Sequence, residues 1–251
     1  GYTAAAEIQP DLAIVIDVTH GEAPDAKDKA GVFPLGSGAV ICRGPNLDYE
    51  KTLKLIEMAK ENNVNFLFEA SVGGGIPVLR PMTQCMSANE IDEIWGILNG
   101  TTNYILNKMI VDNMDFDSAL KLAQEKGYAE KNPAADIEGH DACRKICILA
   151  AIAFGEHVYP QQVPTEGIRG VTLEDVAYAD SCGCKIKLLG RAIRQDNGKV
   201  CAFVAPHLVS GENPLSGVED VFNAIAVNGN AVGDTMFYGR GAGKLPTASA
   251  V

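Results

Sequence analysis

The sequence has little positive charge. Its 251 residues include 21 lysines and arginines against 32 aspartates and glutamates, so the formal net charge is −11 and the isoelectric point lies near 4.8. Nucleic acids and anionic membranes are bound by basic surfaces. The excess of acidic residues therefore argues against both as partners.

Long apolar runs and a regular cysteine pattern are also missing. No run approaches the roughly 18 apolar residues of a membrane span, and no signal-peptide pattern is present. Seven irregularly spaced cysteines fit a reducing compartment better than a disulfide framework. The cysteines and the four histidines lack metal-ligand spacing. A chain of this length that is 47% hydrophobic is expected to be a cytoplasmic globular protein of one large or two small domains.

Two nucleotide-binding patterns are absent as well. No G-x-G-x-x-G stands between a predicted strand and helix, and the segment LGSGAV (35–40) lacks the third glycine. The segment YGRGAGKLPTAS (238–249) fails the Walker pattern, because Tyr238 occupies its first glycine position and Leu245 follows the lysine. The sequence therefore predicts no complete Rossmann domain.

Hydrophobic periodicity predicts a mixture of strands and helices. The expected strands cover residues 11–20, 38–43, 65–72 and 90–98, and the expected helices cover 48–63, about 78–87, 104–113, 118–126 and 138–154. Asp115 or Asp117 is expected to cap the fourth helix and Gly127 to end it. After residue 171, helix alternates with short strands. This order indicates an α/β or α+β fold.

A polar cluster precedes the most apolar helix, in the segment GYAEKNPAADIEGHDACRK (127–145). Asp141 and Lys145 are four residues apart and share a helix face, which in most proteins is an exposed ion pair worth about 0.3–0.5 kcal/mol. Here the run ICILAAIAF follows Lys145 directly, and a helix that is apolar all round is buried. Glu130, Asp136 and Asp141 are near enough in sequence to surround a lysine that handles a proton.

Two further segments suggest binding, and each has a simpler explanation. Glu69 precedes three glycines in FEASVGGGIP, where backbone carbonyls and a carboxylate could hold a cation, although the pattern favours a strand-end glutamate facing water. Gly100 and Thr101 lie at a strand-to-helix turn whose free N–H groups favour an anion. Thr101 or Thr102 could simply cap the helix.

Six segments in order resemble the catalytic domain of homoserine dehydrogenases and cover residues 66–251. They are FLFEASVGGGIP, GILNGTTNYIL, GYAEKNPAADIEGHDACRKICILA, CKIKLLG, NPLSGVEDVFNAI and GRGAGKLPTASAV. The resemblance implies a mixed sheet covered by helices. It also implies NAD(P)H-dependent reduction of L-aspartate 4-semialdehyde to L-homoserine, on the route to threonine, isoleucine and methionine.

The resemblance also implies roles for individual residues. Lys145 and Asp141 match the family's catalytic lysine and the acid beside it. The expected substrate-binding residues are Glu130, Asp136, Tyr128, Gly100 and Thr101. Glu69 and the carbonyl groups of Val72, Gly74 and Ile76 match a monovalent-cation site, usually sodium. Gly241 and Gly243 lie in the loop that resembles the one running toward the nucleotide, and a homodimer is expected.

Residues 1–65 resemble a different family, the M42 metallo-aminopeptidases, through the segments GYTAAAEIQPDLAIVIDVTHGEAP and LGSGAVICRGPN. Asp17 matches one metal-binding aspartate of that family, and its other ligands have no counterparts. The expected organisation is an M42-like α/β fragment at 1–65 joined to the catalytic domain at 66–251, without the nucleotide domain and inactive alone. Two alternatives are a catalytically idle module that binds homoserine and dimerises, and a remnant of an M42 hydrolase.

Overall fold

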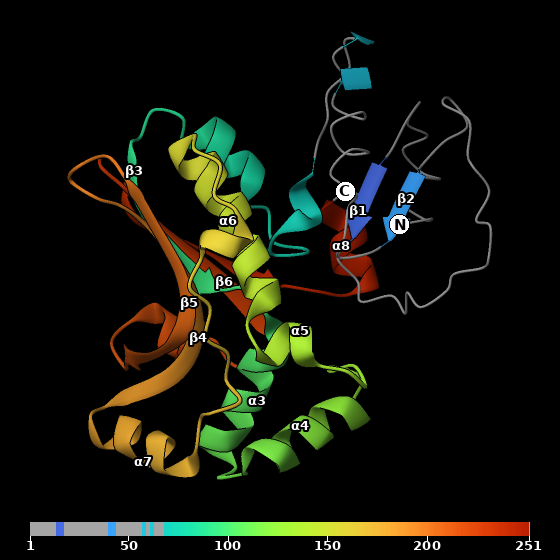
Figure 1. Cartoon of the computed structure of the whole chain (residues 1–251), viewed down its shortest axis with the longest axis vertical. Helices are drawn as coiled ribbons and strands as arrows, with labels where there is room; N and C mark the ends of the chain where they lie inside the picture. The colour runs from blue at the N-terminus through green and yellow to red at the C-terminus, as the bar shows by residue number, and fades with distance from the viewer. Residues whose placement is uncertain (1–13, 18–39, 44–56, 59–60, 63–67, 251) are drawn as a thin grey trace.

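The computed structural model of the chain describes residues 14–17, 40–43, 57–58, 61–62 and 68–250 (Figure 1). Two short parallel strands, β1 (Ile14–Asp17) and β2 (Val40–Arg43), lie within the strands predicted at 11–20 and 38–43. Most of the helix predicted at 48–63 lies outside the described residues. The remaining chain forms one sheet with helices.

The main sheet has five strands in the order β5-β4-β3-β6-β7. Their bounds are β3 Ile91–Ile97, β4 Cys184–Arg194, β5 Val200–Ser210, β6 Phe222–Gly229 and β7 Gly233–Arg240. All four neighbouring pairs are antiparallel, and an isolated parallel bridge joins Thr165 to Val204. The α+β class is confirmed. The expected sheet of mixed parallel and antiparallel strands is wrong, because all strands of the five-stranded sheet are antiparallel to their neighbours.

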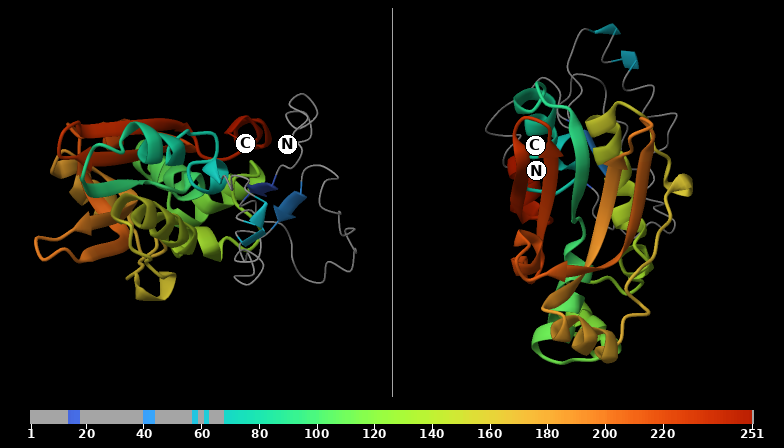
Figure 2. Two further views of the ribbon diagram at one scale, coloured as in Figure 1. Left: turned by 90° about the horizontal axis from the view of Figure 1, so that it is seen from above. Right: turned by 90° about the vertical axis from the view of Figure 1, so that its left-hand side faces the viewer.

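Helices cover one face of this sheet (Figures 1 and 2). Helix α6 (His140–Phe154) packs against β3, β4 and β5, and α3 (Gly100–Val111) and α7 (Leu173–Ser181) contact β4. Helices α4 (Phe116–Glu125) and α5 (Ala134–Ile137) pack on α3, and α8 (Lys244–Ala250) lies beside the turn η1 (Glu69–Ser71), to the right of the sheet in Figure 1. The large hydrophobic core lies between α6, which contributes Ile146, and the inward residues of the strands, such as Ile94 and Ile225; all three are fully buried. Helix α6, which contains Lys145, is therefore fixed by the core.

The approach of α6 to the sheet depends on Gly190 in β4. A Cβ at this position would lie 2.8 Å from Leu98 Cδ1 and 3.1 Å from Ile146 Cβ. The second distance is tighter than most packed carbon contacts. The absence of a side chain at residue 190 therefore lets α6 lie against the strands.

The opposite face of the sheet carries a smaller apolar cluster, formed by residues such as Ile97, Leu189 and Ala224 under the turn η4 (Pro214–Gly217). Beyond η4, no described helix covers this face, which turns toward the viewer on the right of Figure 2. Met236 and Tyr238 of β7 are exposed and pair with Ala226 and Ala224 of β6. The sheet thus has one closed and one largely open face.

Two predicted element boundaries need correction. The strand predicted at 65–72 is wrong where the structure describes it, because Glu69–Ser71 form the 3-10 turn η1. Helix α3 begins at Gly100, and its N-cap is Asn99 rather than Thr101 or Thr102. Asp115 caps α4, as one of the two alternatives expected, and Gly127 follows its end at a φ of 75°.

Candidate active site

Lys145 and Asp141 lie one turn apart at the beginning of α6. Lys145 Nζ is 2.7 Å from Asp141 Oδ2 and donates a second hydrogen bond, of 3.0 Å, to the carbonyl oxygen of Leu98. The side chains of Lys145 and Asp141 are only 14% and 4% exposed. The alternative of an exposed surface pair is therefore wrong, and removing one partner would leave a poorly solvated charge.

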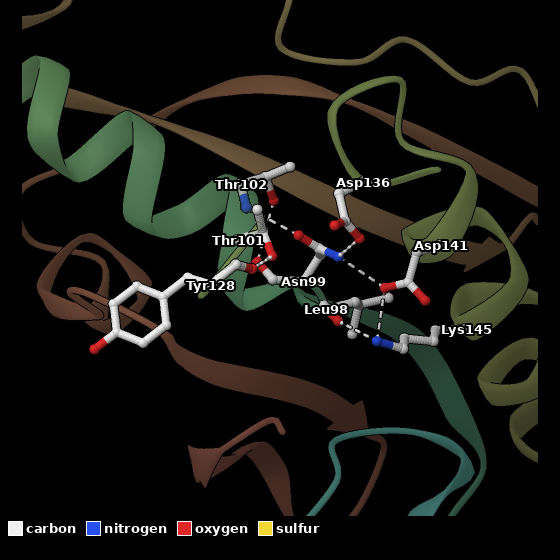
Figure 3. A network of polar contacts seen from close by, with 8 residues as sticks. All are labelled: Leu98, Asn99, Thr101, Thr102, Tyr128, Asp136, Asp141 and Lys145. Carbon is white, nitrogen blue, oxygen red and sulfur yellow. Dashed lines mark hydrogen bonds and ion pairs between the residues drawn. The ribbon is translucent and has the colours of Figure 1, made fainter. Parts of the chain in front are cut away.

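Asn99 joins this ion pair to a second carboxylate (Figure 3). Its amide nitrogen donates to Asp136 Oδ1 at 2.7 Å and to Asp141 Oδ2 at 2.9 Å. Its amide oxygen accepts a hydrogen bond from Thr102 N at 2.9 Å. Asn99 is thus both the N-cap of α3 and the bridge between two aspartates that are each 3% exposed.

Asn99 was missed by reasoning from the sequence alone. An asparagine before G-T-T at the end of a strand is a recognisable N-cap signal. The bridge to Asp136 and Asp141 is not recognisable in this way, because those residues follow it by 37 and 42 positions. Only the packing of α5 and α6 against the end of β3 brings them together.

The other predicted substrate residues lie at different distances from this cluster. Thr101 Oγ1 donates to the carbonyl oxygen of Tyr128 at 2.7 Å, which ties the start of α3 to the loop before α5. The Tyr128 ring points away from the two aspartates in Figure 3 and packs edge-on against Tyr104 with 5.0 Å between centroids. Glu130 is exposed, and its backbone carbonyl accepts a hydrogen bond from Gln124.

Lys145 retains a hydrogen-bonding group for a ligand. An ammonium group has three N–H donors, and the described structure accounts for two of them, at Leu98 and Asp141. A donor held from two sides and oriented at the end of a strand suits an oxygen that gains negative charge. The neighbouring carboxylates suit a cationic group of the same ligand.

Glu69 is buried and holds the segment that follows it. Its carboxylate accepts hydrogen bonds from the N–H groups of Val78, Leu79 and Arg80 at 2.6, 2.7 and 2.8 Å. A carboxylate has about four lone-pair positions, so one remains for another partner. The water-facing strand end considered from the sequence is therefore wrong for Glu69, which is 9% exposed.

The carbonyl groups predicted to hold a cation lie in the turn after Glu69. Among the described residues, no hydrogen-bond donor reaches the carbonyl oxygens of Val72, Gly74 or Ile76. One carboxylate lone pair and several unpaired carbonyl oxygens are suitable ligands for a hard cation. The chemistry of these residues thus fits a monovalent cation.

Gly241 packs against two parts of the molecule through its backbone. A Cβ at Gly74 would overlap the Gly241 carbonyl, and a Cβ at Gly241 would overlap the amide of Asn223. Gly75 N also donates to the Arg240 carbonyl oxygen at 3.1 Å. The glycine segment at 239–243 is therefore held between the turn after Glu69 and strand β6, and Gly243 follows at a φ of 121°.

Comparison with known proteins assigns most of the chain to one family. The family model described as homoserine dehydrogenase matches residues 77–251. The chain belongs to the homoserine dehydrogenase family. The homoserine dehydrogenase of Synechocystis is 42% identical over 96% of this chain and 56% of its own length, and that of Bacillus subtilis is 46% identical over 96% and 55%.

Solved homoserine dehydrogenases share the fold. The crystal structure from Thiobacillus denitrificans has a TM-score of 0.80 and 39% identity, and covers 97% of this chain and 56% of its own. A hyperthermophilic archaeal homoserine dehydrogenase in complex with NADPH has a TM-score of 0.67 and 30% identity, with 84% and 60% coverage. The chain thus spans little more than half the length of the relatives it matches.

The N-terminal residues match two families. The M42 glutamyl aminopeptidase model matches residues 1–76, which confirms the resemblance expected there. The homoserine dehydrogenase relatives from Synechocystis and B. subtilis nevertheless extend over 96% of the chain, so they also include much of this segment. The boundary between residues 65 and 66 stays a prediction.

No helix in the described part of the chain is long and apolar enough to cross a bilayer.

Proposed function

We propose that this chain carries the substrate-binding and dimerisation part of a homoserine dehydrogenase. The reaction is the NAD(P)H-dependent reduction of L-aspartate 4-semialdehyde to L-homoserine in cytoplasmic amino-acid biosynthesis, which leads to threonine, isoleucine and methionine. The observation that carries this proposal is Lys145, whose amine is held by Asp141 and the Leu98 carbonyl with one N–H left for a ligand.

The proposed binding mode follows from the charges around Lys145. Asp136 and Asp141 attract the ammonium group of the amino acid, and Glu130 adds negative charge at the exposed rim. The backbone N–H groups of Gly100 and Thr101, at the start of α3, favour the ligand's carboxylate. Tyr128 belongs to the same rim through its backbone bond to Thr101.

The chemical role of Lys145 is to stabilise the substrate oxygen. NAD(P)H, when bound, supplies the hydride. Lys145 directs its remaining N–H at the aldehyde oxygen and donates to it as negative charge develops. Asp141 and the Leu98 carbonyl keep the amine from rotating, so the geometry is set before the ligand arrives. Gly241 and Gly243 are the proposed nucleotide-facing positions, where the absence of side chains permits close approach.

A cation and a second subunit complete the proposal. Sodium bound by Glu69 and the carbonyl groups of Val72, Gly74 and Ile76 would fix the turn that packs on Gly241. A homodimer formed through the open face of the sheet would cover Met236 and Tyr238, which are 42% and 52% exposed. Exposed apolar side chains on one flat face are typical of such interfaces.

An idle binding module is the second candidate, favoured by the chain's coverage of only about 56% of the Synechocystis relative. Such a module would bind L-homoserine and dimerise without reducing the semialdehyde. The M42 match at 1–76 leaves a hydrolase remnant as a third possibility, and elemental analysis for zinc or cobalt in the purified chain separates it from the others.

The deciding experiment measures binding and turnover separately. L-homoserine is titrated into the chain by calorimetry, and NADPH oxidation is followed by absorbance with L-aspartate 4-semialdehyde. We expect binding that Lys145→Ala weakens about tenfold or more, because a charged hydrogen bond is lost. We expect no turnover by the chain alone.

Lys108→Ala is the matched control, because Lys108 and Asp112 form the same i,i+4 ion pair at the surface, with 2.9 Å between Nζ and Oδ2. It should leave homoserine affinity unchanged. Turnover that is abolished by Lys145→Ala would overturn the idle module. Absence of homoserine binding to the unaltered chain would overturn the proposed function itself.

A further inference from the structure

Two buried asparagines have opposite hydrogen-bonding environments. Asn103 and Asn223 are each 1% exposed. The amide nitrogen of Asn103 donates to three backbone carbonyl groups in the segment 218–222, and its oxygen accepts from Lys187. The amide oxygen of Asn223 has no hydrogen-bond partner among the described residues. Only Asn103 is thus satisfied within the fold.

The unpaired oxygen of Asn223 lies beside the candidate active site. Asn223 is on β6 and shares the helix-covered face with Ile225, which lies in the main core. The neighbouring residue Ala224 pairs with Ile97 at the end of β3, one position before Leu98. A Cβ on Gly100, the first residue of α3, would lie 3.5 Å from Asn223 Oδ1.

A buried carbonyl oxygen without a hydrogen-bond donor lowers the free energy of unfolding by about 1–3 kcal/mol. Such groups are uncommon in folded proteins, and a catalytic role or a bound water or ion is among their explanations. We propose that Asn223 is a ligand-binding residue, whose side-chain oxygen accepts a hydrogen bond from the ammonium or hydroxyl group of the bound amino acid. This inference rests on the proposed function and adds a residue to that same pocket.

Gly241 covers the amide of Asn223. A side chain at 241 would overlap that amide, and the oxygen is sealed from solvent in this structure. Access of a ligand to Oδ1 therefore requires the 239–243 segment to move from this packed position, which its glycines permit. Asn223 in this way connects the ligand to the segment proposed to face the nucleotide.

The test compares two substitutions of similar size, Asn223→Leu and Asn103→Leu, in the full chain. Melting temperature and calorimetric affinity for L-homoserine are measured for both. We expect Asn223→Leu to keep or raise the melting temperature, because it removes an unsatisfied group, and to weaken L-homoserine binding about tenfold or more. Asn103→Leu should lower the melting temperature, because it strands several buried carbonyl groups.

Two further ligands identify the donor. L-2-aminobutyrate keeps the ammonium group and lacks the hydroxyl, whereas 4-hydroxybutyrate has the reverse. A loss of affinity shared by L-homoserine and L-2-aminobutyrate assigns the ammonium group to Asn223, and a loss confined to ligands with the hydroxyl assigns that group.

Three results would overturn the proposal. A melting temperature lowered by Asn223→Leu as much as by Asn103→Leu, with homoserine affinity unchanged, shows a purely structural asparagine. If the unaltered chain binds L-homoserine and Asn223→Leu binds it equally well, the role of Asn223 fails while the proposed function stands. If the unaltered chain does not bind L-homoserine, both fail together.

Discussion

Lys145 and Lys187 are two buried lysines on opposite sides of the sheet. Lys145 lies in the second turn of α6, on the covered side, and contacts the carboxylate of Asp141. Lys187 is 1% exposed on β4, between Ile186 and Leu188 of the main core, and so points to the other side. Its Nζ donates to Asn103 Oδ1 at 3.1 Å and to the Val218 carbonyl oxygen at 2.6 Å.

The difference between the two lysines lies in the charge of their partners. Among the described residues, no carboxylate lies within ion-pair distance of Lys187. Burial, aided by Lys185 and opposed by Glu219, lowers the pKa of Lys187 to about 8. Above a pH of about 8 the amine of Lys187 is mainly neutral and has two N–H donors, which match its two acceptors. Lys187 thus holds the 218–222 segment, whereas Lys145 lies beside a carboxylate and has two acceptors for the three N–H groups of an ammonium.

Asp141→Ala should have the largest effect, because it removes the counter-ion of Lys145 and an acceptor of Asn99 together. The expected loss is about 3–5 kcal/mol of unfolding free energy, measured by urea denaturation. Adding Lys145→Met to this variant should recover part of the loss by removing the unpaired charge. A double variant less stable than the single one would show that the pair is not the source of the effect.

The second largest effect is expected from Lys187, whose buried amine should make the free energy of unfolding depend on pH. The unfolded lysine has its usual pKa of 10.5, above the folded value of about 8. Between these values the unfolded chain binds more protons, so the free energy of unfolding rises with pH, by at most about 3 kcal/mol from this group. Urea denaturation at several pH values in this window should show the rise. Lys187→Met should remove it, and a rise of the same size in that variant would contradict the assignment to Lys187.

The smallest effect is expected from the exposed pair on α3. Lys108→Ala should cost about 0.3–0.5 kcal/mol, because an i,i+4 pair in water gains little. The hydrogen bond to Asp112 is the main reason that the pKa of Lys108 lies above its usual value. The side chains of Lys108 and Asp112 are 23% and 41% exposed, so solvent weakens the pair. Added salt should reduce the difference in unfolding free energy between the variant and the unaltered chain. A loss of unfolding free energy as large as that of Asp141→Ala would contradict the proposed difference between buried and exposed pairs.

Local sequence pattern predicted those parts of the site that lie on one element. Asp141 and Lys145 were found because they are four residues apart before an apolar run, and that pattern determines both helix and burial. The roles of Asn99, Asn103 and Lys187 depend on partners dozens of positions away. In CKIKLLG, a lysine between apolar residues is indistinguishable from an exposed strand residue.

The wrong prediction around Glu69 has a similar cause. The alternation in NFLFEASV favours a strand, but the carboxylate of Glu69 pairs with N–H groups 9 to 11 residues later. This tertiary interaction ends extended structure and produces the turn at 69–71. Propensity is a weak signal where a single buried charge collects several backbone donors.

Gly190 influences the position of the candidate site from outside it. Because α6 rests on a position without a side chain, the height of that helix above β4 sets how far the Lys145 amine reaches past Leu98. A mutation that adds one methyl group at residue 190 would touch neither ligand nor catalytic atom, yet it would lift the lysine by a fraction of an ångström. A substitution at residue 190 is therefore expected to alter the candidate site without changing any of its residues.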